Sequence, residues 1–350
     1  MIWLTWRQFR TQAWVALAAL AVIAIGLGTT GLHLVHLYDA NGVPACRAAG
    51  CAREAASFLN QVKATAGYAG LYQAGIPVLY AVPGLIGAFW GAPLIARELE
   101  AGTLGLAWTQ SVSRTRWLTV KVGLIGLASV VTAGLLSLLV TWWGAPIDRA
   151  GQLAASGQRV DLEVLGRFTP LMFGARGITP VGYAAFAFAL GVTAGVLIRH
   201  TLAAMAASLA AFAGIQVAFA LWIRAHLITP LAGSAPFNSA NLTELSADGS
   251  GQITVVARVS RPGAWILSNQ TVTASGHPFT GPAPAACVSD TGSFQSCQRA
   301  LGTLHLRQLV TYQPASRYWA FQWTETAIFV ALAVALAGLC YWWVRRRRMA

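Results

Sequence analysis

The sequence predicts an all-α polytopic membrane protein with six transmembrane helices, an N-terminal interfacial helix, and a small strand-containing extracellular domain between helices 5 and 6. Two observations lead to this prediction. Of the 350 residues, 56% are hydrophobic and 10% are charged, whereas soluble domains contain about 25% charged residues. The apolar residues also gather into six runs, each of about 18 residues or more, which is the length that crosses a bilayer.

Residues 1–12 are predicted to form the interfacial helix, and residues 13–224 the first five spans. On a helix, the apolar residues of this first segment share one face, whereas Arg7 and Arg10 lie off it, as in helices that lie among lipid headgroups. The alternative is that the segment only flanks the first span, residues 14–37. That span is longer than the roughly 7–15 residues of a signal-peptide core, so we expect it to stay uncleaved.

The second span, residues 71–96, contains three prolines. Because a proline leaves a backbone carbonyl without its helical partner, we expect this span to be kinked and buried in a bundle. A GxxxG step at Gly87–Gly91 and another at Gly191–Gly195 permit close contact between helices. The third to fifth spans are expected at residues 119–143, 179–198 and 202–223, and polar loops at 38–70 and 144–178.

Residues 225–319 differ in composition from the spans. They are rich in Pro, Gly, Ser and Thr, and they contain short β-branched runs such as Ile253–Val256 and Thr271–Thr273. This pattern predicts the small strand-containing extracellular domain. Residues 320–350 hold the sixth span, expected at 320–344, and a basic tail.

Six spans place both termini on the same side of the membrane. Basic residues are densest in the short segments on that side, which include Arg7, Arg10 and residues 345–348. Because short cytoplasmic segments are enriched in Lys and Arg, we expect both termini in the cytoplasm. Only Lys63 and Lys121 among the 24 basic residues are lysines. This bias fits a GC-rich bacterial genome and thus a bacterial plasma membrane.

The cysteines predict two disulfides. Cys46 and Cys51 lie in one predicted outer loop, and Cys287 and Cys297 lie in another, both on the oxidising side of the membrane. A metal site is the alternative, but these spacings are not usual for zinc, so we expect disulfides and no metal. Cys340 stands alone in an apolar run and is expected to pack or to face lipid.

No stretch of the sequence carries catalytic chemistry, so we do not expect an enzyme. Neither lysine closes a phosphate-binding G-x-x-x-x-G-K-[ST] loop, because Lys63 precedes Ala64 and Lys121 precedes Val122. The sequence contains neither H-E-x-x-H nor G-x-S-x-G. The net charge of +13 would favour nucleic acid in a soluble protein, but basic residues beside spans set topology, and no nucleic-acid partner is expected.

Glu325 is the acidic residue nearest the interior of a span, about one turn inside the outer end of the sixth. A charge deep in lipid would indicate a functional site. Near the interface, however, the carboxylate can reach water or pair with Arg317. We favour this interpretation over a role in transport.

A charged segment, residues 95–121, separates the second and third spans, and the topology places it in the cytoplasm. Its run Glu98-Leu-Glu100-Ala-Gly102-Thr103-Leu104, followed by Ser113-Arg114 and then Lys121, resembles the ABC-2 type permease family of type-2 ABC exporters. Members carry an E-x-x-x-G-T-[LF]-x-x-L pattern, an S-R step and a lysine between the second and third spans. Their interfacial helix, six spans and large last outer loop are similar as well. Gln110-Ser111 stands where members often have a proline.

The resemblance implies that the chain is the permease subunit of an ABC exporter. Two permease chains, as a homo- or heterodimer, would form the pathway through the lipid bilayer. Separate ABC ATPase subunits would hold ATP and Mg²⁺ and dock on the cytoplasmic loops, and this chain would need no cofactor of its own. A helix beginning near Glu98–Glu100 would place these acids at its positive N-terminus. The resemblance assigns coupling to the ATPase to Glu98, Glu100, Gly102, Thr103, Ser113 and Arg114.

Three other classes of protein are alternatives. One is a transmembrane ABC protein that transmits force and moves no cargo, a class that typically has four spans and a larger outer domain. A membrane sensor would bind a ligand with its extracellular domain and pass a signal inward; a histidine-kinase partner would indicate it, and an ATPase partner would indicate the permease. A secondary carrier is disfavoured, because such carriers keep ionisable groups near the bilayer midplane, where this sequence places none.

Overall fold

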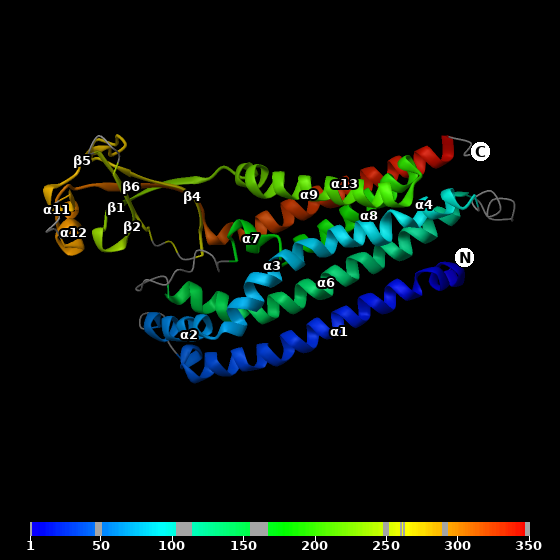
Figure 1. The fold of residues 1–350 in the computed structure, drawn as a ribbon, viewed down its shortest axis with the longest axis horizontal. Helices are drawn as coiled ribbons and strands as arrows, with labels where there is room; N and C mark the ends of the chain where they lie inside the picture. The colour runs from blue at the N-terminus through cyan, green and yellow to red at the C-terminus, as the bar shows by residue number, and fades with distance from the viewer. Residues whose placement is uncertain are drawn as a thin grey trace.

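The computed structural model describes residues 2–45, 51–102, 114–154, 167–247, 252–259, 261, 263–288 and 293–346. Its long helices form an elongated bundle, with the strands gathered at one end and both chain termini at the other (Figure 1). We call these the β-domain end and the termini end. Within the described residues, six helical segments are long and apolar enough to cross a membrane, which confirms the predicted number of spans.

Four spans are built around one continuous helix each, and two are interrupted by a π-helical turn. The continuous helices are α1 (Ile2–Ala40), α6 (Arg114–Ala154), α8 (Thr179–Ile198) and α13 (Tyr318–Arg346). The second span consists of α3 (Ala66–Ile86), a π-helical turn (Gly87–Gly91) and α4 (Pro93–Glu100). The fifth consists of α9 (Thr201–Ala218), a π-helical turn (Phe219–Ile223) and α10 (Arg224–His226).

The structure does not show a separate N-terminal interfacial helix. The backbone is helical without a break from Ile2 to Ala40, and the candidate span begins at Phe9. Neither glycine nor proline occurs between Ile2 and Gly26, so the local sequence contains no residue that would end the helix. The first residues of α1 therefore belong to the same continuous helix as the first span.

Two segments predicted to be polar loops contain helix. α6 continues beyond residue 143 to Ala154, and α2 (Ala52–Ala64) forms within residues 38–70. Phe58 and Leu59 on the buried face of α2 belong to one apolar cluster with Ile147 of α6. Because burial of an amphipathic face supplies most of the stability of a helix in a protein, each of these helices supports the other.

α8 is the centre of the bundle. It contacts α3, α4, α6, α9 and α13, and 67% of its most apolar stretch is buried, compared with 6% for α1. Its Gly191–Gly195 step packs on the Gly87–Gly91 turn: a Cβ at Gly191 would lie 2.9 Å from the backbone nitrogen of Ala92. The two predicted GxxxG steps therefore meet each other, and the backbones approach where side chains are missing.

The strand-containing region, which we call the β domain, lies between the fifth and sixth spans. One sheet has the strand order β1 (Leu231–Pro236), β6 (Arg307–Gln313), β4 (Trp265–Val272), and the other has β2 (Leu242–Ala247), β3 (Gln252–Ala257), β5 (Gly281–Pro282). Every strand pair is antiparallel. The Cys287–Cys297 disulfide joins α11 (Ala285–Val288) to α12 (Phe294–Gly302), as predicted. Cys51 is disulfide-bonded too, whereas Cys46 lies outside the described residues.

An aromatic cluster joins the β domain to the bundle. Trp265 of β4 packs with Phe168, with Phe173 of the short helix α7 (Pro170–Phe173), and with Tyr318 and Phe321 at the start of α13. Phe168 contacts the four other rings at centroid distances between 5.4 and 6.0 Å. Aromatic pairs of this geometry add stability beyond their buried area. The cluster therefore fixes the β domain against the end of the sixth span.

Candidate functional site

Glu98 and Lys121 form an ion pair between the second and third spans at the termini end. Glu98 lies on α4 and Lys121 on α6, and the ammonium of Lys121 donates to the Glu98 carboxylate. Lys121 is 2% exposed, and its Nζ lies 4.7 Å from the centroid of the Trp117 ring. A buried ammonium is costly unless it is paired, so the carboxylate and the ring face together hold the charge. The pair fixes the two spans on either side of the predicted coupling segment.

Glu100 connects the second span to the fifth. Its Oε1 accepts from the backbone nitrogen of Thr201 at 2.9 Å, and its Oε2 accepts from the Thr201 hydroxyl at 2.5 Å. The Nδ1 of His200 lies 3.5 Å from the same carboxylate. The first amides of a helix have no partner within it, and negative charge is favoured there. Glu100 therefore caps the N-terminus of α9 from a neighbouring element.

These contacts correct one expectation. The acids were predicted to lie at the start of a helix, but α4 ends at Glu100. Gly102 adopts a positive φ of 64°, which favours glycine and commonly ends a helix, and its nitrogen donates to the carbonyl of Leu99 at 3.3 Å. The favourable helix N-terminus is that of α9. Sequence reasoning could not find it, because it lies about a hundred residues further along the chain.

The structure brings together only part of the predicted coupling set. Glu98, Glu100 and Gly102 lie within one and a half turns of each other at the end of α4. Thr103 and Ser113 lie outside the described residues. Arg114 begins α6, and its side chain is outside the description as well.

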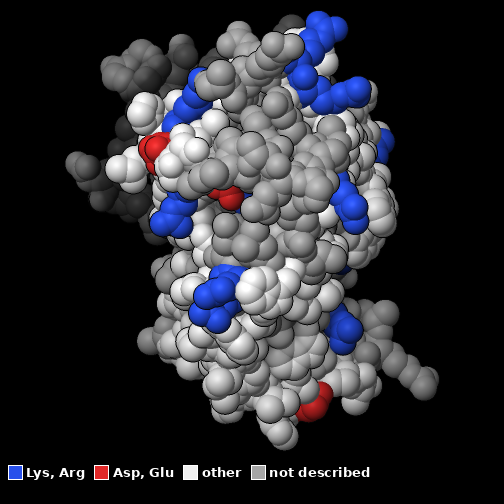
Figure 2. Space-filling model, turned by 90° about the vertical axis from the view of Figure 1, so that its right-hand side faces the viewer, with Lys and Arg blue, Asp and Glu red and all other residues white. Residues whose placement is uncertain are grey.

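Basic side chains surround this cluster at the surface. Figure 2 looks onto the termini end, where Lys and Arg are spread over the face and acidic groups are few. The exposed arginines that lie at this end of the bundle are Arg7, Arg10, Arg97, Arg116, Arg199, Arg345 and Arg346. Such a surface attracts acidic groups of a partner or of lipid headgroups.

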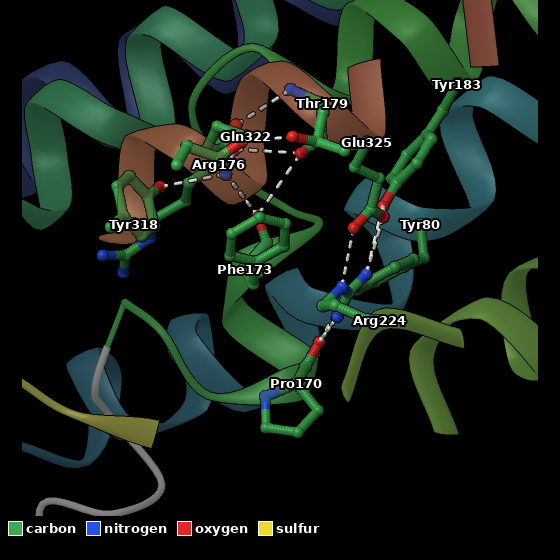
Figure 3. A network of polar contacts seen from close by, with 12 residues as sticks. Tyr80, Pro170, Phe173, Arg176, Thr179, Tyr183, Arg224, Tyr318, Gln322 and Glu325 are labelled. Atoms are coloured by element: carbon green, nitrogen blue, oxygen red, sulfur yellow. Dashed lines mark hydrogen bonds and ion pairs between the residues drawn. The ribbon is translucent and has the colours of Figure 1, made fainter. Parts of the chain in front are cut away.

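A second polar cluster lies inside the bundle near the β-domain end (Figure 3). Arg224 of α10 donates from Nε to Oε2 of Glu325 at 2.8 Å and from Nη2 to Oε1 at 2.9 Å. The Tyr183 hydroxyl donates to the same carboxylate, and Nη1 of Arg224 donates to the Pro170 carbonyl at 2.8 Å. Both charged side chains are fully buried. The network therefore joins α7, α8, α10 and α13.

This cluster corrects the interpretation of Glu325. The carboxylate was expected to reach water or to pair with Arg317, but it is buried and pairs with Arg224. Arg317 donates instead to the carbonyl of Thr229 at 2.7 Å and to the side chain of Gln313 at 2.9 Å. Arg224 directly follows the predicted fifth span, residues 202–223, and the sequence alone does not place it inside the bundle. A basic and an acidic residue, each near the outer end of a span, are the signal that could have suggested the pair.

Gln322 forms the centre of a neighbouring set of hydrogen bonds. Its Oε1 accepts from the backbone nitrogens of Ile178 and Thr179, at 2.9 and 3.1 Å. Its Nε2 donates to the carbonyls of Phe173 and Arg176, both at 3.1 Å. One buried amide of α13 thus satisfies donors at the start of α8 and acceptors in the segment that precedes it.

At both ends of the bundle the polar clusters join elements that are distant in the sequence. Within the described ranges, no cluster of three or more His, Cys, Asp or Glu side chains could hold a metal ion. Among the described residues, the buried charged side chains of Lys121, Arg176, Arg224 and Glu325 form ion pairs that join different elements of the bundle.

Comparison with known families gives one match. The family model described as ABC-2 membrane transporter related matches residues 17–224. This range includes most of the first and fifth spans, all of the second to fourth, and the charged segment between the second and third. Searches of curated proteins and of solved structures return no match.

Proposed function

The chain belongs to the ABC-2 membrane transporter related family, and from this premise we propose that it is the membrane-spanning permease subunit of an ABC exporter. The observation that carries the proposal is that the family match includes the charged segment whose acids connect three spans. ATP and Mg²⁺ would be held by separate ATPase subunits. A second permease chain, identical or not, would complete the pathway.

The distribution of charge supports a cytoplasmic termini end. The exposed arginines gather on that face (Figure 2), and short cytoplasmic segments are the ones enriched in basic residues. The Cys287–Cys297 disulfide lies at the opposite end of the molecule, where an oxidising exterior would preserve it. Both features favour an orientation with the termini inside and the β domain outside, and the scarcity of lysine among the basic residues favours a bacterial plasma membrane.

The contacts of α4 suggest how a force from the ATPase would reach the pathway. The Glu98–Lys121 pair links α4 to α6, and Glu100 links α4 to the start of α9. The adjoining π-helical turn of the same span packs on α8 without intervening side chains. A push on residues 95–121 would therefore act on the second, third, fourth and fifth spans together. This is the role that we propose for Glu98, Glu100 and Gly102, and for Thr103, Ser113 and Arg114 by their place in the sequence.

The experiment compares charge variants in proteoliposomes that contain the permease and its ATPase. Glu98→Lys places two cations together, so we expect loss of substrate-stimulated ATPase activity and of transport, with normal membrane insertion. The exchange variant E98K/K121E restores an opposite-charge pair and should recover part of both activities. Glu244→Lys makes the same charge change on the exposed surface of β2 and should behave as wild type.

Three outcomes would contradict the proposal. Substrate-stimulated ATPase activity that survives in E98K would remove the coupling role. Equal loss in E98K and in the E244K control would show that the effect does not come from the site. Co-purification of the wild-type chain with a histidine kinase, and not with an ATPase, would favour the membrane-sensor class instead.

A further inference from the structure

A groove of about 1060 Å³ runs along the side of the bundle at the termini end. One wall is the first turns of α6 and the other is the C-terminal part of α13 from Val334 onward, with Ala189 and Val192 of α8 between them. The groove lies within the candidate spans 116–154 and 315–346. It therefore opens sideways toward the membrane, and apolar side chains make up most of its lining, including Leu118, Val122, Val334, Ala337 and Tyr341.

Two glycines keep the groove open. Gly123 lies on the α6 wall and Gly338 on the α13 wall, and a Cβ built on either would meet no atom within 4 Å. The small side chain of Ala189 on the floor leaves further space in the groove. These glycines differ from those at the centre of the bundle, where the missing side chain lets two helices touch. The space they leave is not filled by any described part of the chain.

The end of the groove nearest the C-terminus is positively charged. Arg345 and Arg346 line it and are exposed, and the Arg346 guanidinium lies 5.0 Å from the centroid of the Trp342 ring. No carboxylate is among the lining residues, and neither arginine forms an ion pair with another described residue. Tryptophan and arginine at the end of a span lie at headgroup level. The groove is therefore apolar along its length and cationic at one end.

The geometry points to a binding site for one anionic glycerophospholipid, with an acyl chain along the α6–α8–α13 groove and the phosphate at Arg345 and Arg346. An apolar hollow at membrane depth fits a hydrocarbon chain, and the unneutralised arginines select for negative charge. A second copy of this chain is a poorer occupant, because symmetry would bring four arginines together. The site does not depend on the coupling role proposed above or on the direction of transport.

The test uses the full chain purified in detergent and native mass spectrometry with added phosphatidylglycerol or phosphatidylcholine. Wild type is expected to retain one phosphatidylglycerol and no phosphatidylcholine. In R345Q/R346Q, retention should fall about 5- to 25-fold, because each basic residue near a membrane surface strengthens binding of anionic lipid about fivefold. Gly338→Leu should abolish retention by filling the groove.

The controls separate this groove from charge in general. R7Q/R10Q removes two arginines from the same end of the bundle, where the Arg7 guanidinium also lies over a tryptophan ring, Trp3, at 5.5 Å. Gly26→Leu adds the same side chain at a glycine of α1 that likewise has open space. Both control variants should retain the lipid as wild type does.

Four results would overturn the site. These are equal retention of the two lipids, equal loss in R345Q/R346Q and R7Q/R10Q, unchanged retention in Gly338→Leu, and displacement of the lipid by millimolar inorganic phosphate. If R345Q/R346Q does not yield folded protein, photolabelling of the wild-type chain tests the site instead. Phosphatidylglycerol with a photoreactive acyl tail should then label residues 118–123 or 334–342, and labelling confined to other segments overturns the proposal.

Discussion

Arg224 and Glu325 are 101 positions apart in the chain, yet they form an ion pair in which the Nε–Oε2 distance is 2.8 Å and both side chains are fully buried. Arg224 lies just before the β domain and Glu325 just after it. The pair therefore fastens the two connections of the domain to each other inside the bundle. Two further hydrogen bonds, nearer the β domain, join the same two connections. Gln313 donates to the carbonyl of Ile228 at 2.6 Å, and Arg317 donates to the carbonyl of Thr229 at 2.7 Å.

Arg224→Met is expected to lower the free energy of unfolding by about 3–5 kcal/mol, because it leaves the carboxylate of Glu325 buried without its cation. The double variant R224M/E325L removes both charges and should recover most of the loss. Arg317→Met, near the same end, should cost less, about 1.5–3 kcal/mol, because its partners are neutral and no buried charge is left behind. Denaturant unfolding in detergent micelles measures all three. A double variant as unstable as Arg224→Met would contradict the prediction.

Gln322→Leu should destabilise the junction between the fourth and sixth spans by about 1–3 kcal/mol for each buried backbone group that loses its partner. The amides of Ile178 and Thr179 would lose their acceptor, so their hydrogen exchange should become faster. Thr324→Ala is the matched control two positions away, because the Thr324 hydroxyl bonds only the carbonyl of Ala320 in its own helix. Unchanged exchange at Ile178 and Thr179 would show that Gln322 does not support this junction.

Gly191→Ala should be destabilising by about 1–3 kcal/mol, the usual cost of forcing an extra methyl group into a filled core. The new Cβ would press on the backbone of the Gly87–Gly91 turn, which cannot withdraw as a side chain could. Gly214→Ala is the control, since nothing lies within 4 Å of its Cβ position, and the better helix propensity of alanine should make it neutral or slightly stabilising. If the two variants had the same thermal unfolding midpoint, the result would contradict close contact between these spans.

Loss of the Cys287–Cys297 disulfide should loosen the β domain and leave the bundle intact. The bridge closes a ten-residue separation, and a loop of this size is expected to contribute about 2–3 kcal/mol. The variant C287A/C297A should be cleaved faster by protease within residues 225–319, with unchanged unfolding of the spans. Treatment of wild type with a reductant should speed the cleavage within residues 225–319 in the same way, and only this segment is compared because the reductant also breaks the disulfide of Cys51. Faster cleavage within the spans as well would show that the two parts do not unfold independently.

Several features could be predicted from the sequence because they depend on local pattern. The span of α8, residues 179–198, was predicted with its observed bounds. Pro180 stands in the first turn, where proline is favoured, and Arg199 ends the apolar run. Pairing of Cys287 with Cys297 followed from their separation in a polar segment. The close helix contact at both GxxxG steps followed from the absence of a side chain on glycine. The lengths of α1 and α6 could not be predicted from the sequence, because packing against neighbours, and not hydropathy alone, decides where a helix ends.

The sequence by itself determined the membrane class and the number of spans. It also determined that the β domain lies in the chain between the fifth and sixth spans and that a charged segment lies between the second and third. These follow from runs of apolar residues, whose transfer into lipid is favourable whatever the neighbours are. The tertiary structure alone decided the partners of the charges: Lys121 for Glu98, the start of α9 for Glu100, and Arg224 for Glu325. A buried charge must find its counterpart in space, and no periodicity along the chain records which distant residue supplies it.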